Sequence, residues 1–199
     1  MELSLNNIVI DFSVAFKAVD EKGPVGKSNT RIYKPGVGPL TENVAVTKAL
    51  TYLQQVKNSD YRDTTPKSYP NSKKRCDLLI PKKWVLEFKL VRPYHDNGKE
   101  DEDWSKNLFY PLRGSTGCIG DCIKLAESTF EEKKALLVFG FEHDPPKIEL
   151  TKMVKLFEVL AKTVGVQLGP CHNATFGPLI HPIHQQGRIF GWEVLSYNQ

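Results

Sequence analysis

Three residues near the middle of the chain, Asp77, Glu87 and Lys89, have the types and spacing of a metal-supported hydrolytic site. Two converging carboxylates supply the hard oxygen ligands that Mg²⁺ prefers. Bound Mg²⁺ lowers the pKa of a water, and a neighbouring lysine stabilises negative charge that develops on a phosphate. The backbone carbonyl of Phe88 is a further candidate ligand. These residues favour cleavage of a phosphodiester bond, with Asp77, Glu87 and Lys89 as catalytic residues and Mg²⁺ as cofactor.

Two short strands must position these residues. The pattern predicts strands over about 75–80 and 84–91, joined by a turn at Pro81-Lys82-Lys83 that folds Asp77 back towards Glu87. Alternate residues of a strand share a face, so Val85, Glu87 and Lys89 point one way. The opposite face is apolar and consists of Trp84, Leu86, Phe88 and Leu90. If the strand is central, the two charges must be paired or must coordinate an ion.

Asp77, nine intervening residues and then Glu87-Phe88-Lys89 resemble the PD-(D/E)xK signature of the restriction-endonuclease-like nucleases. The resemblance covers roughly residues 41–145, and Cys76 stands where the signature has proline. It implies an endonuclease that uses Mg²⁺, with Mn²⁺ as an expected substitute, and that leaves 5′-phosphate ends on DNA. The alternative is a catalytically silent module of the same fold that binds nucleic acid or protein.

Glu42 is a candidate for a further metal ligand, because such nucleases often carry an acid on the first core helix. Thr41 begins a predicted helix, and Glu42 shares a face with Val46, Ala49 and Leu53. A purely local role, in which Glu42 complements the helix dipole, fits equally well. Asp121 and Lys124 lie one turn apart on a later predicted helix, where a surface ion pair is expected over a place in the cleft.

The basic residues are concentrated around the motif. From Lys67 to Arg92 there are eight lysines and arginines but only two acids, Asp77 and Glu87, in a chain of formal charge +4. Such a stretch suits a polyanion, although a solvated lysine-rich surface explains it too. The residues expected to contact phosphates of DNA, duplex rather than single-stranded, are Lys73, Lys74, Arg75, Arg92 and Arg113.

The remaining pattern predicts an α/β protein with a restriction-endonuclease-like core, in which a central mixed β-sheet is flanked by helices. Residues 3–19 alternate as an extra N-terminal strand, 20–40 and 58–72 read as loops, and Ser115 or Thr116 begins a helix to about 128. Residues 135–139 suit a central strand, Thr151 begins another helix, and 176–197 suit a C-terminal hairpin turning at Gln185-Gln186-Gly187. The expected organisation is one domain, 1–199, with an N-terminal β extension (1–40), the core (41–145) and a C-terminal helix and hairpin (146–199).

Several classes of protein are not expected. No apolar run approaches the roughly 20 residues of a membrane span, and the first residues do not resemble a signal peptide. Four cysteines do not suggest a disulfide framework, so a cytoplasmic setting is expected. A zinc site is not expected at Cys171, His172, His181 and His184, because the pairing of ligands is too loose. The sequence leaves a homodimer open.

Overall fold

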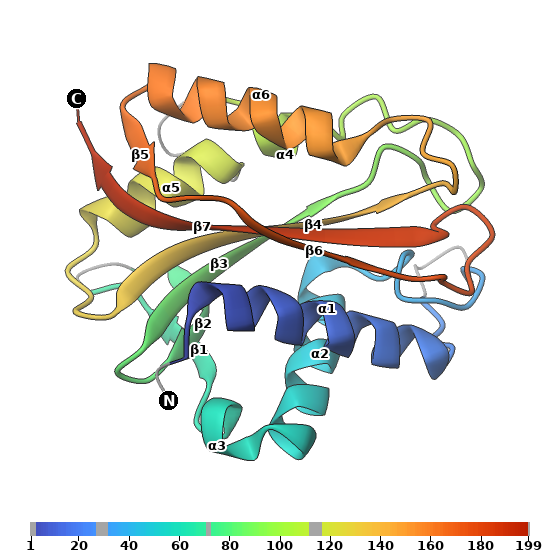
Figure 1. Ribbon diagram of the computed structural model, residues 1–199, viewed down its shortest axis with the longest axis horizontal. Coiled ribbons are helices and arrows are strands. Elements are labelled where there is room, and N and C mark those ends of the chain that lie inside the picture. Colours follow the sequence, from blue (N-terminus) through green and yellow to red (C-terminus); the bar gives the residue numbers. More distant parts are fainter. Residues whose placement is uncertain (1–2, 27–31, 71–72, 112–116, 199) are drawn as a thin grey trace.

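The computed structural model describes residues 3–26, 32–70, 73–111 and 117–198. Within these ranges the chain forms an α/β structure of six helices and a mixed, open sheet of seven strands (Figure 1). The helices are α1 (Leu5–Glu21), α2 (Glu42–Val56), α3 (Asn58–Tyr61), α4 (Lys106–Phe109), α5 (Cys118–Glu127) and α6 (Leu150–Thr163). The strands are β1 (Thr65–Ser68), β2 (Arg75–Ile80), β3 (Trp84–Val91), β4 (Lys133–Glu142), β5 (Val166–Leu168), β6 (His172–Phe176) and β7 (Gln186–Tyr197). None of the described helices is long and apolar enough to cross a membrane.

The sheet has the order β1-β2-β3-β4-β7-β5, and β6 also pairs with β7. Only the pairing of β3 with β4 is parallel among these strands; the other ladders are antiparallel. The predicted strands 75–80 and 84–91 are confirmed, and the predicted central strand is β4, whose last eight residues are buried. As a result β3, which carries the motif, lies inside the sheet between β2 and β4.

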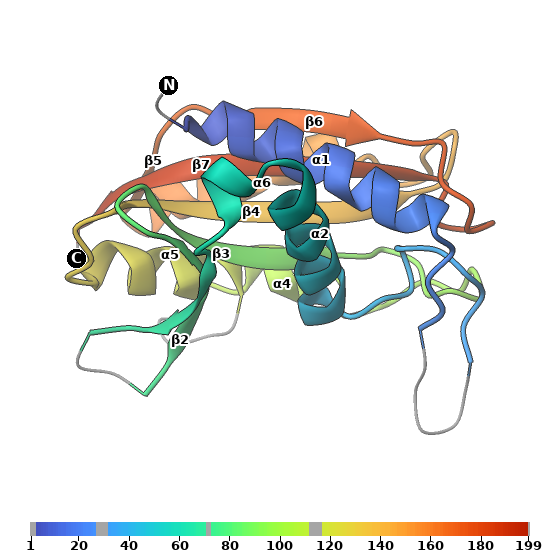
Figure 2. The same ribbon diagram turned by 90° about the horizontal axis from the view of Figure 1, so that it is seen from below.

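Helices cover both faces of the sheet. Figures 1 and 2 show α1 and α2 on one face and α4, α5 and α6 on the other. On the first face Phe12 and Phe16 of α1 pack against Phe88 of β3 and Phe139 of β4. On the second face Phe157 of α6 packs against Trp192 of β7 at a ring distance of 5.3 Å. The predicted alternation of β3 is confirmed, because Trp84, Leu86, Phe88 and Leu90 belong to the first core and Val85 to the second.

The prediction of a strand over residues 3–19 is wrong, because this segment is helix α1. Ser4 caps the helix: its hydroxyl accepts a hydrogen bond from the Asn7 amide at 3.1 Å, and the Asn7 side chain accepts one from the Ser4 amide. The apolar residues that alternate here also recur every three or four positions. The residues at the helical spacing are the ones that the structure buries. Ile8 is fully buried, whereas Ile10 and Val14 are 43% and 52% exposed.

Other boundaries differ in detail. Helix α2 begins at Glu42 after Thr41, as expected, although the Thr41 side chain makes no capping hydrogen bond. The predicted loop 58–72 contains α3 and β1. Helix α5 is confirmed, but its expected caps Ser115 and Thr116 lie outside the described residues. Helix α6 has Glu149 rather than Thr151 at its N-cap. The predicted C-terminal strand is confirmed as β7, but the turn at Gln185-Gln186-Gly187 is wrong, because β7 already begins at Gln186. Its antiparallel partner β6 precedes the predicted hairpin, and residues 177–185 connect the two strands.

A buried carboxylate fixes the loop that leads into α2. Asp20, at the end of α1 and fully buried, accepts hydrogen bonds from the amides of Val37 at 2.9 Å and Ile180 at 2.8 Å. It thereby joins the segment before α2 to the connection between β6 and β7. In that connection, His184 Nε2 forms a hydrogen bond with the Tyr94 carbonyl. His184 also packs directly on Gly38, where any larger residue would place its Cβ only 2.4 Å from the His184 Cβ. These contacts hold the segment that leads to Glu42 against the connection between β6 and β7.

The assignment of residues 5–21 as a helix can be tested with two isoleucines that a strand would place on the same face. Ile8→Ala should lower the free energy of unfolding by about 2–5 kcal/mol, because it removes buried methyl groups. Ile10→Ala should change it by no more than about 0.5 kcal/mol, because that side chain faces solvent. Urea unfolding measures both variants. Equal losses for the two would contradict the helix.

Candidate active site

The first two motif residues meet where β2 and β3 separate. Backbone pairing runs from Ile80↔Trp84 to Leu78↔Leu86. Asp77, which precedes Leu78, contacts β3 through its side chain instead of its backbone: Asp77 Oδ2 accepts a hydrogen bond from the Phe88 amide at 2.7 Å. This contact places the Asp77 carboxylate next to Glu87, which is only 3% exposed. The turn at Pro81-Lys82-Lys83 therefore brings the two acids together as the sequence predicts.

Lys89 and Glu42 lie beside each other on the same side of β3. The Lys89 ammonium is 3.8 Å from Glu42 Oε1, and Glu42 Oε2 accepts a hydrogen bond from the Leu90 amide. The carboxylate of Glu42 thus reaches from the first turn of α2 to the strand that carries Glu87 and Lys89. This placement goes beyond a local role at the helix dipole.

The expectation that Asp121 and Lys124 form a surface ion pair is wrong. Asp121 is 5% exposed, and its Oδ2 lies 3.0 Å from the Lys89 ammonium. Lys124 lies between two acids, with its ammonium 2.9 Å from Asp121 Oδ1 and 2.7 Å from Glu87 Oε1. Helix α5 therefore contributes a second acid and a second lysine. We call Glu42, Asp77, Glu87, Lys89, Asp121 and Lys124 the charged cluster.

Tyr69 is a further member of the site that the sequence analysis missed. Its hydroxyl donates a hydrogen bond to Glu87 Oε1, the oxygen that Lys124 also contacts. The Lys124 ammonium also lies 5.1 Å from the centre of the Tyr69 ring. Nothing in the residues around Tyr69 marks it, because its position depends on how β1 pairs with β2. A signal for Asp121 does exist, since it falls on the apolar stripe of Cys118, Cys122 and Leu125 on α5.

Burial and charge together set the protonation of the cluster. Burial, with repulsion from Asp77 and Asp121, raises the pKa of Glu87 to about 8 despite the attraction of Lys124. Burial also raises the pKa of Glu42 against the attraction of Lys89. Burial opposes the charge of Lys89, but Asp121 and Glu42 outweigh it and raise the pKa of the ammonium. Lys89 therefore keeps its positive charge, and Glu87 holds a proton more readily than an exposed glutamate does.

The donor chemistry of the cluster suits a hard divalent cation, because four carboxylates face only two ammonium groups. Within the described part of the chain, however, no group of three or more histidine, cysteine, aspartate or glutamate side chains is arranged so that it could hold a metal ion. The Lys124 ammonium already contacts Glu87 and Asp121. A metal held by Glu87 and Asp77 would take the place of Lys124 at Glu87. Glu42 remains a candidate for the same ion, as does the Phe88 carbonyl.

The predicted phosphate-binding residues fall into two groups. Lys73, Lys74 and Arg75 are exposed and follow the outer end of the β1–β2 hairpin, which extends from the body in Figure 2. We call this feature the basic hairpin. Arg92 instead points into the body, where its Nη1 donates to the carbonyls of Gly38 at 2.8 Å and Leu40 at 3.2 Å. Arg113 lies outside the described residues.

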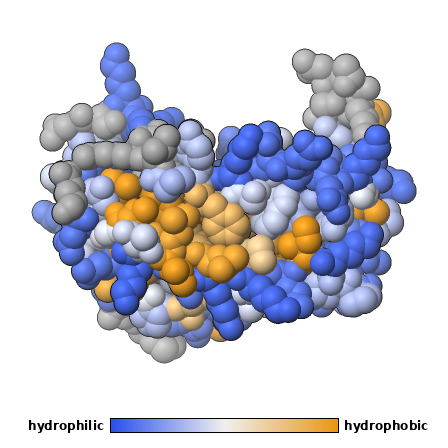
Figure 3. All heavy atoms as spheres, turned by 90° about the horizontal axis from the view of Figure 1, so that it is seen from above, coloured by the Kyte–Doolittle hydropathy of each residue, from blue (hydrophilic) through white to orange (hydrophobic). Residues whose placement is uncertain are grey.

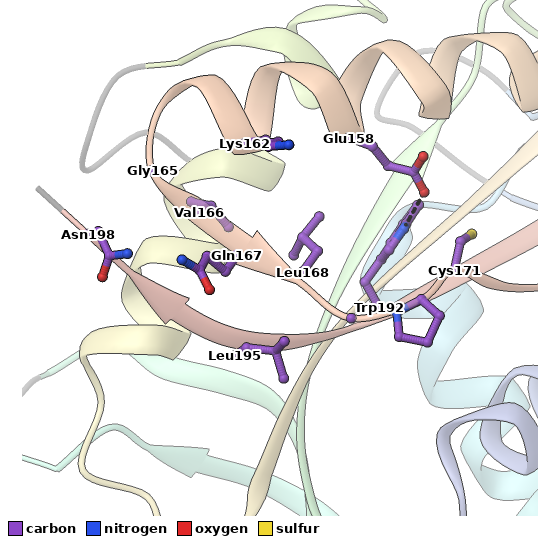
Figure 4. A pocket seen from close by; sticks show the side chains of 12 residues that line it. Glu158, Lys162, Gly165, Val166, Gln167, Leu168, Cys171, Trp192, Leu195 and Asn198 are labelled. Atoms are coloured by element: carbon purple, nitrogen blue, oxygen red, sulfur yellow. Dashed lines mark hydrogen bonds between the residues drawn. The ribbon is translucent and has the colours of Figure 1, made fainter.

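Two hollows of different character flank the sheet. One of about 330 Å³ adjoins the charged cluster and has both Glu42 and Lys89 in its wall. A larger one, of about 780 Å³, lies between α6, β5 and β7 (Figure 4). Its one carboxylate, Glu158, accepts a hydrogen bond from Trp192 Nε1 at 2.7 Å, and no member of the charged cluster reaches it. The smaller hollow is therefore the better candidate for a functional site, because residues of the charged cluster line it.

The raised pKa of Glu87 predicts how stability depends on pH. The folded chain holds the Glu87 proton more tightly than the unfolded chain, where the pKa is near 4.5. The wild-type chain should therefore lose stability relative to Glu87→Gln as pH rises from about 4.5 to 8, by up to about 1.4 kcal/mol per pH unit. Urea unfolding in EDTA at several pH values measures this, with exposed Glu131→Gln as control. Parallel profiles for wild type and Glu87→Gln would contradict it.

Comparison of the chain with protein-family models, with curated proteins and with solved structures finds no significant match. No family is therefore assigned to the chain from these comparisons. The function has to be inferred from the charged cluster, the basic hairpin and the hollow beside them.

Proposed function

We propose that the chain is a metal-dependent nuclease of the PD-(D/E)xK type with a restriction-endonuclease-like core, which hydrolyses phosphodiester bonds of DNA and leaves 5′-phosphate ends. The observation that carries the proposal is that Asp77, Glu87, Lys89 and Glu42 gather at one stretch of β3: Asp77 accepts a hydrogen bond from the Phe88 amide, Glu42 accepts one from the Leu90 amide, and the Lys89 ammonium lies 3.8 Å from Glu42 Oε1. The surrounding mixed sheet with helices on both faces is compatible with such a core. The exposed basic hairpin beside the cluster supports a polyanionic substrate.

The acidic and basic residues of the charged cluster have different roles in the proposed reaction. Asp77, Glu87 and Glu42 are the oxygen donors that would hold Mg²⁺ or Mn²⁺. When bound, the metal supplies an activated water and neutralises charge on the phosphate. Lys89 is held as a cation by Asp121 and Glu42, so it does not act as a general base. Its role is to stabilise the negative charge that develops on the phosphate oxygens.

Lys124 supports a second candidate function. Its contact with Glu87 balances the charge of that acid without a metal ion. A chain that kept this arrangement would bind nucleic acid through the basic hairpin and would not cleave it. A plasmid-nicking assay in Mg²⁺, Mn²⁺ and EDTA separates the two functions, because only the nuclease cuts, and only with metal.

Two substitutions should separate metal binding from turnover. Asp77→Ala should lose both Mn²⁺ binding and cleavage, because it removes an anionic ligand. Lys89→Ala should keep Mn²⁺ binding and lose about 100- to 1000-fold in single-turnover rate, because it removes one contact to the transition state. Isothermal titration with Mn²⁺ and single-turnover cleavage measure the two effects.

Lys155→Ala, an exposed residue of α6, is the control for loss of a lysine and should behave like the wild type. Cleavage by Lys89→Ala at the parent rate would show that the motif is wrongly assigned. Robust cutting in EDTA by the wild type would exclude the metal-dependent mechanism.

The basic hairpin should contribute to binding through phosphates. The double variant Lys73→Ala with Lys74→Ala should bind DNA of every sequence more weakly and should lower the slope of log affinity against log salt by about two. Fluorescence anisotropy in Ca²⁺ over a range of salt concentrations measures the slope. Lys152→Ala with Lys155→Ala on α6 is the matched control, and an unchanged slope for the hairpin variant would refute the role of the hairpin.

A further inference from the structure

The hollow beside the charged cluster has walls of mixed chemistry. Lys89 and Glu42 form the side next to the cluster, and Arg92 follows at the end of β3. The opposite wall comes from the segment after β3 and from α4, and it presents Asp101, Trp104 and Asn107. This wall thus combines one aromatic side chain with a carboxylate and a carboxamide, across the hollow from the proposed catalytic lysine.

Hydrogen bonds to β3 and its flank hold this wall in place. Asn107 Nδ2 donates to the Leu90 carbonyl at 3.1 Å, which fixes the side chain against the strand. The Asp101 amide donates to the Pro93 carbonyl at 2.9 Å, and the Trp104 amide donates to the Asp101 carbonyl at 3.3 Å. Asp101 Oδ1 accepts from the Asp103 amide at 3.0 Å. The polar groups of the wall are therefore positioned before any ligand arrives.

The walls of the hollow exclude some ligands and suit others. The carboxylates of Asp101 and Glu42 offset the cations Lys89 and Arg92 in the wall, so the hollow has no excess positive charge with which to hold a phosphate. A volume of about 330 Å³ lies at the small end of the roughly 300–1,000 Å³ typical of small-molecule pockets. A base-paired duplex is too wide to enter. A planar heterocycle is small enough, can stack on Trp104, and can hydrogen-bond to a carboxylate and an amide along its edge.

We propose that this hollow is a nucleobase pocket, which receives one unstacked base adjoining the scissile phosphate and stacks it on Trp104. Asp101 accepts a hydrogen bond from an exocyclic amino group, so adenine, cytosine and guanine are favoured over thymine. The proposal rests on the proposed nuclease function for what happens at Lys89. It makes the substrate a strand with an unpaired nucleotide at the cleavage point, either single-stranded or turned out of a duplex.

An abasic scan tests the pocket without requiring cleavage. A short DNA oligonucleotide is bound in Ca²⁺, and the base is removed at one position at a time. The wild type should show one position at which removing the base weakens binding about tenfold. Trp104→Ala should bind the intact oligonucleotide about tenfold more weakly and should be indifferent to the abasic site at that position, because the two changes remove the same contact.

Three further variants serve as checks. Trp104→Phe keeps an aromatic ring and should retain most of the effect, which separates stacking from loss of fold. Tyr110→Ala removes an exposed aromatic residue that does not line the hollow, and should leave the scan unchanged. Asp101→Asn replaces an acceptor by a group that also donates, and should reduce the preference for cytosine over thymine at the sensitive position.

The outcomes separate this proposal from the nuclease proposal. Cleavage of plasmid without any base-sensitive position, or additive losses for Trp104→Ala and the abasic site, would overturn the pocket and leave the nuclease. A single sensitive position that depends on Trp104, found in a chain that does not cleave, would support the pocket and overturn the nuclease.

Discussion

The arrangement of the helices around β3 depends on one constraint: Glu87 and Lys89 are charged residues on a strand that has a neighbouring strand on each side. β3 pairs with β2 and β4, and its other side packs on the aromatic core of α1, yet it carries Glu87 and Lys89. Charges in such a place are stable only when they are paired. Helices α2 and α5 meet this requirement from two directions with Glu42, Asp121 and Lys124. Helix α2 on one face of the sheet and helix α5 on the other (Figure 1) are thereby both tied to β3.

The same arrangement leaves different surroundings on the two sides of the cluster. The basic hairpin lies on the β2 side, with exposed cations, and the hollow follows the end of β3 on the other side, with a single aromatic wall residue. Under the proposed function, a strand of nucleic acid that crosses the cluster would contact the cations of the basic hairpin at one end and the hollow lined by Trp104 at the other. Elsewhere, helix α6 exposes Leu156 and Val159. Helix α6 lies at the top of Figure 1, and Figure 3, which looks at the molecule from above, shows apolar side chains gathered on that face.

The strands and the pairing of Asp77 with Glu87 could be predicted because they follow from local rules: alternation over 84–91 and a turn at Pro81-Lys82-Lys83. The N-terminal segment could not, because Ile8, Ile10, Phe12 and their neighbours satisfy the strand and helix periods together. The hydrogen bonds of Ser4 with Asn7 favour the helix that the structure shows. Asp121 was misjudged because a polar residue on an apolar stripe reveals its partner only when the helix is packed. Tyr69 depends on strand pairing across a loop, which no short pattern encodes.

The contacts of Asp20 have a consequence for a chain that is still being synthesised. One carboxylate joins the segment before Glu42 to Ile180, a residue much later in the sequence. These contacts span about 160 positions, as the separation of Asp20 from Ile180 shows, and contacts of such range form late in folding. On the ribosome, the motif strands can pair well before this connection has emerged. In a nascent chain, the strands that carry Asp77, Glu87 and Lys89 are therefore available before the contact that ties down the segment leading to Glu42.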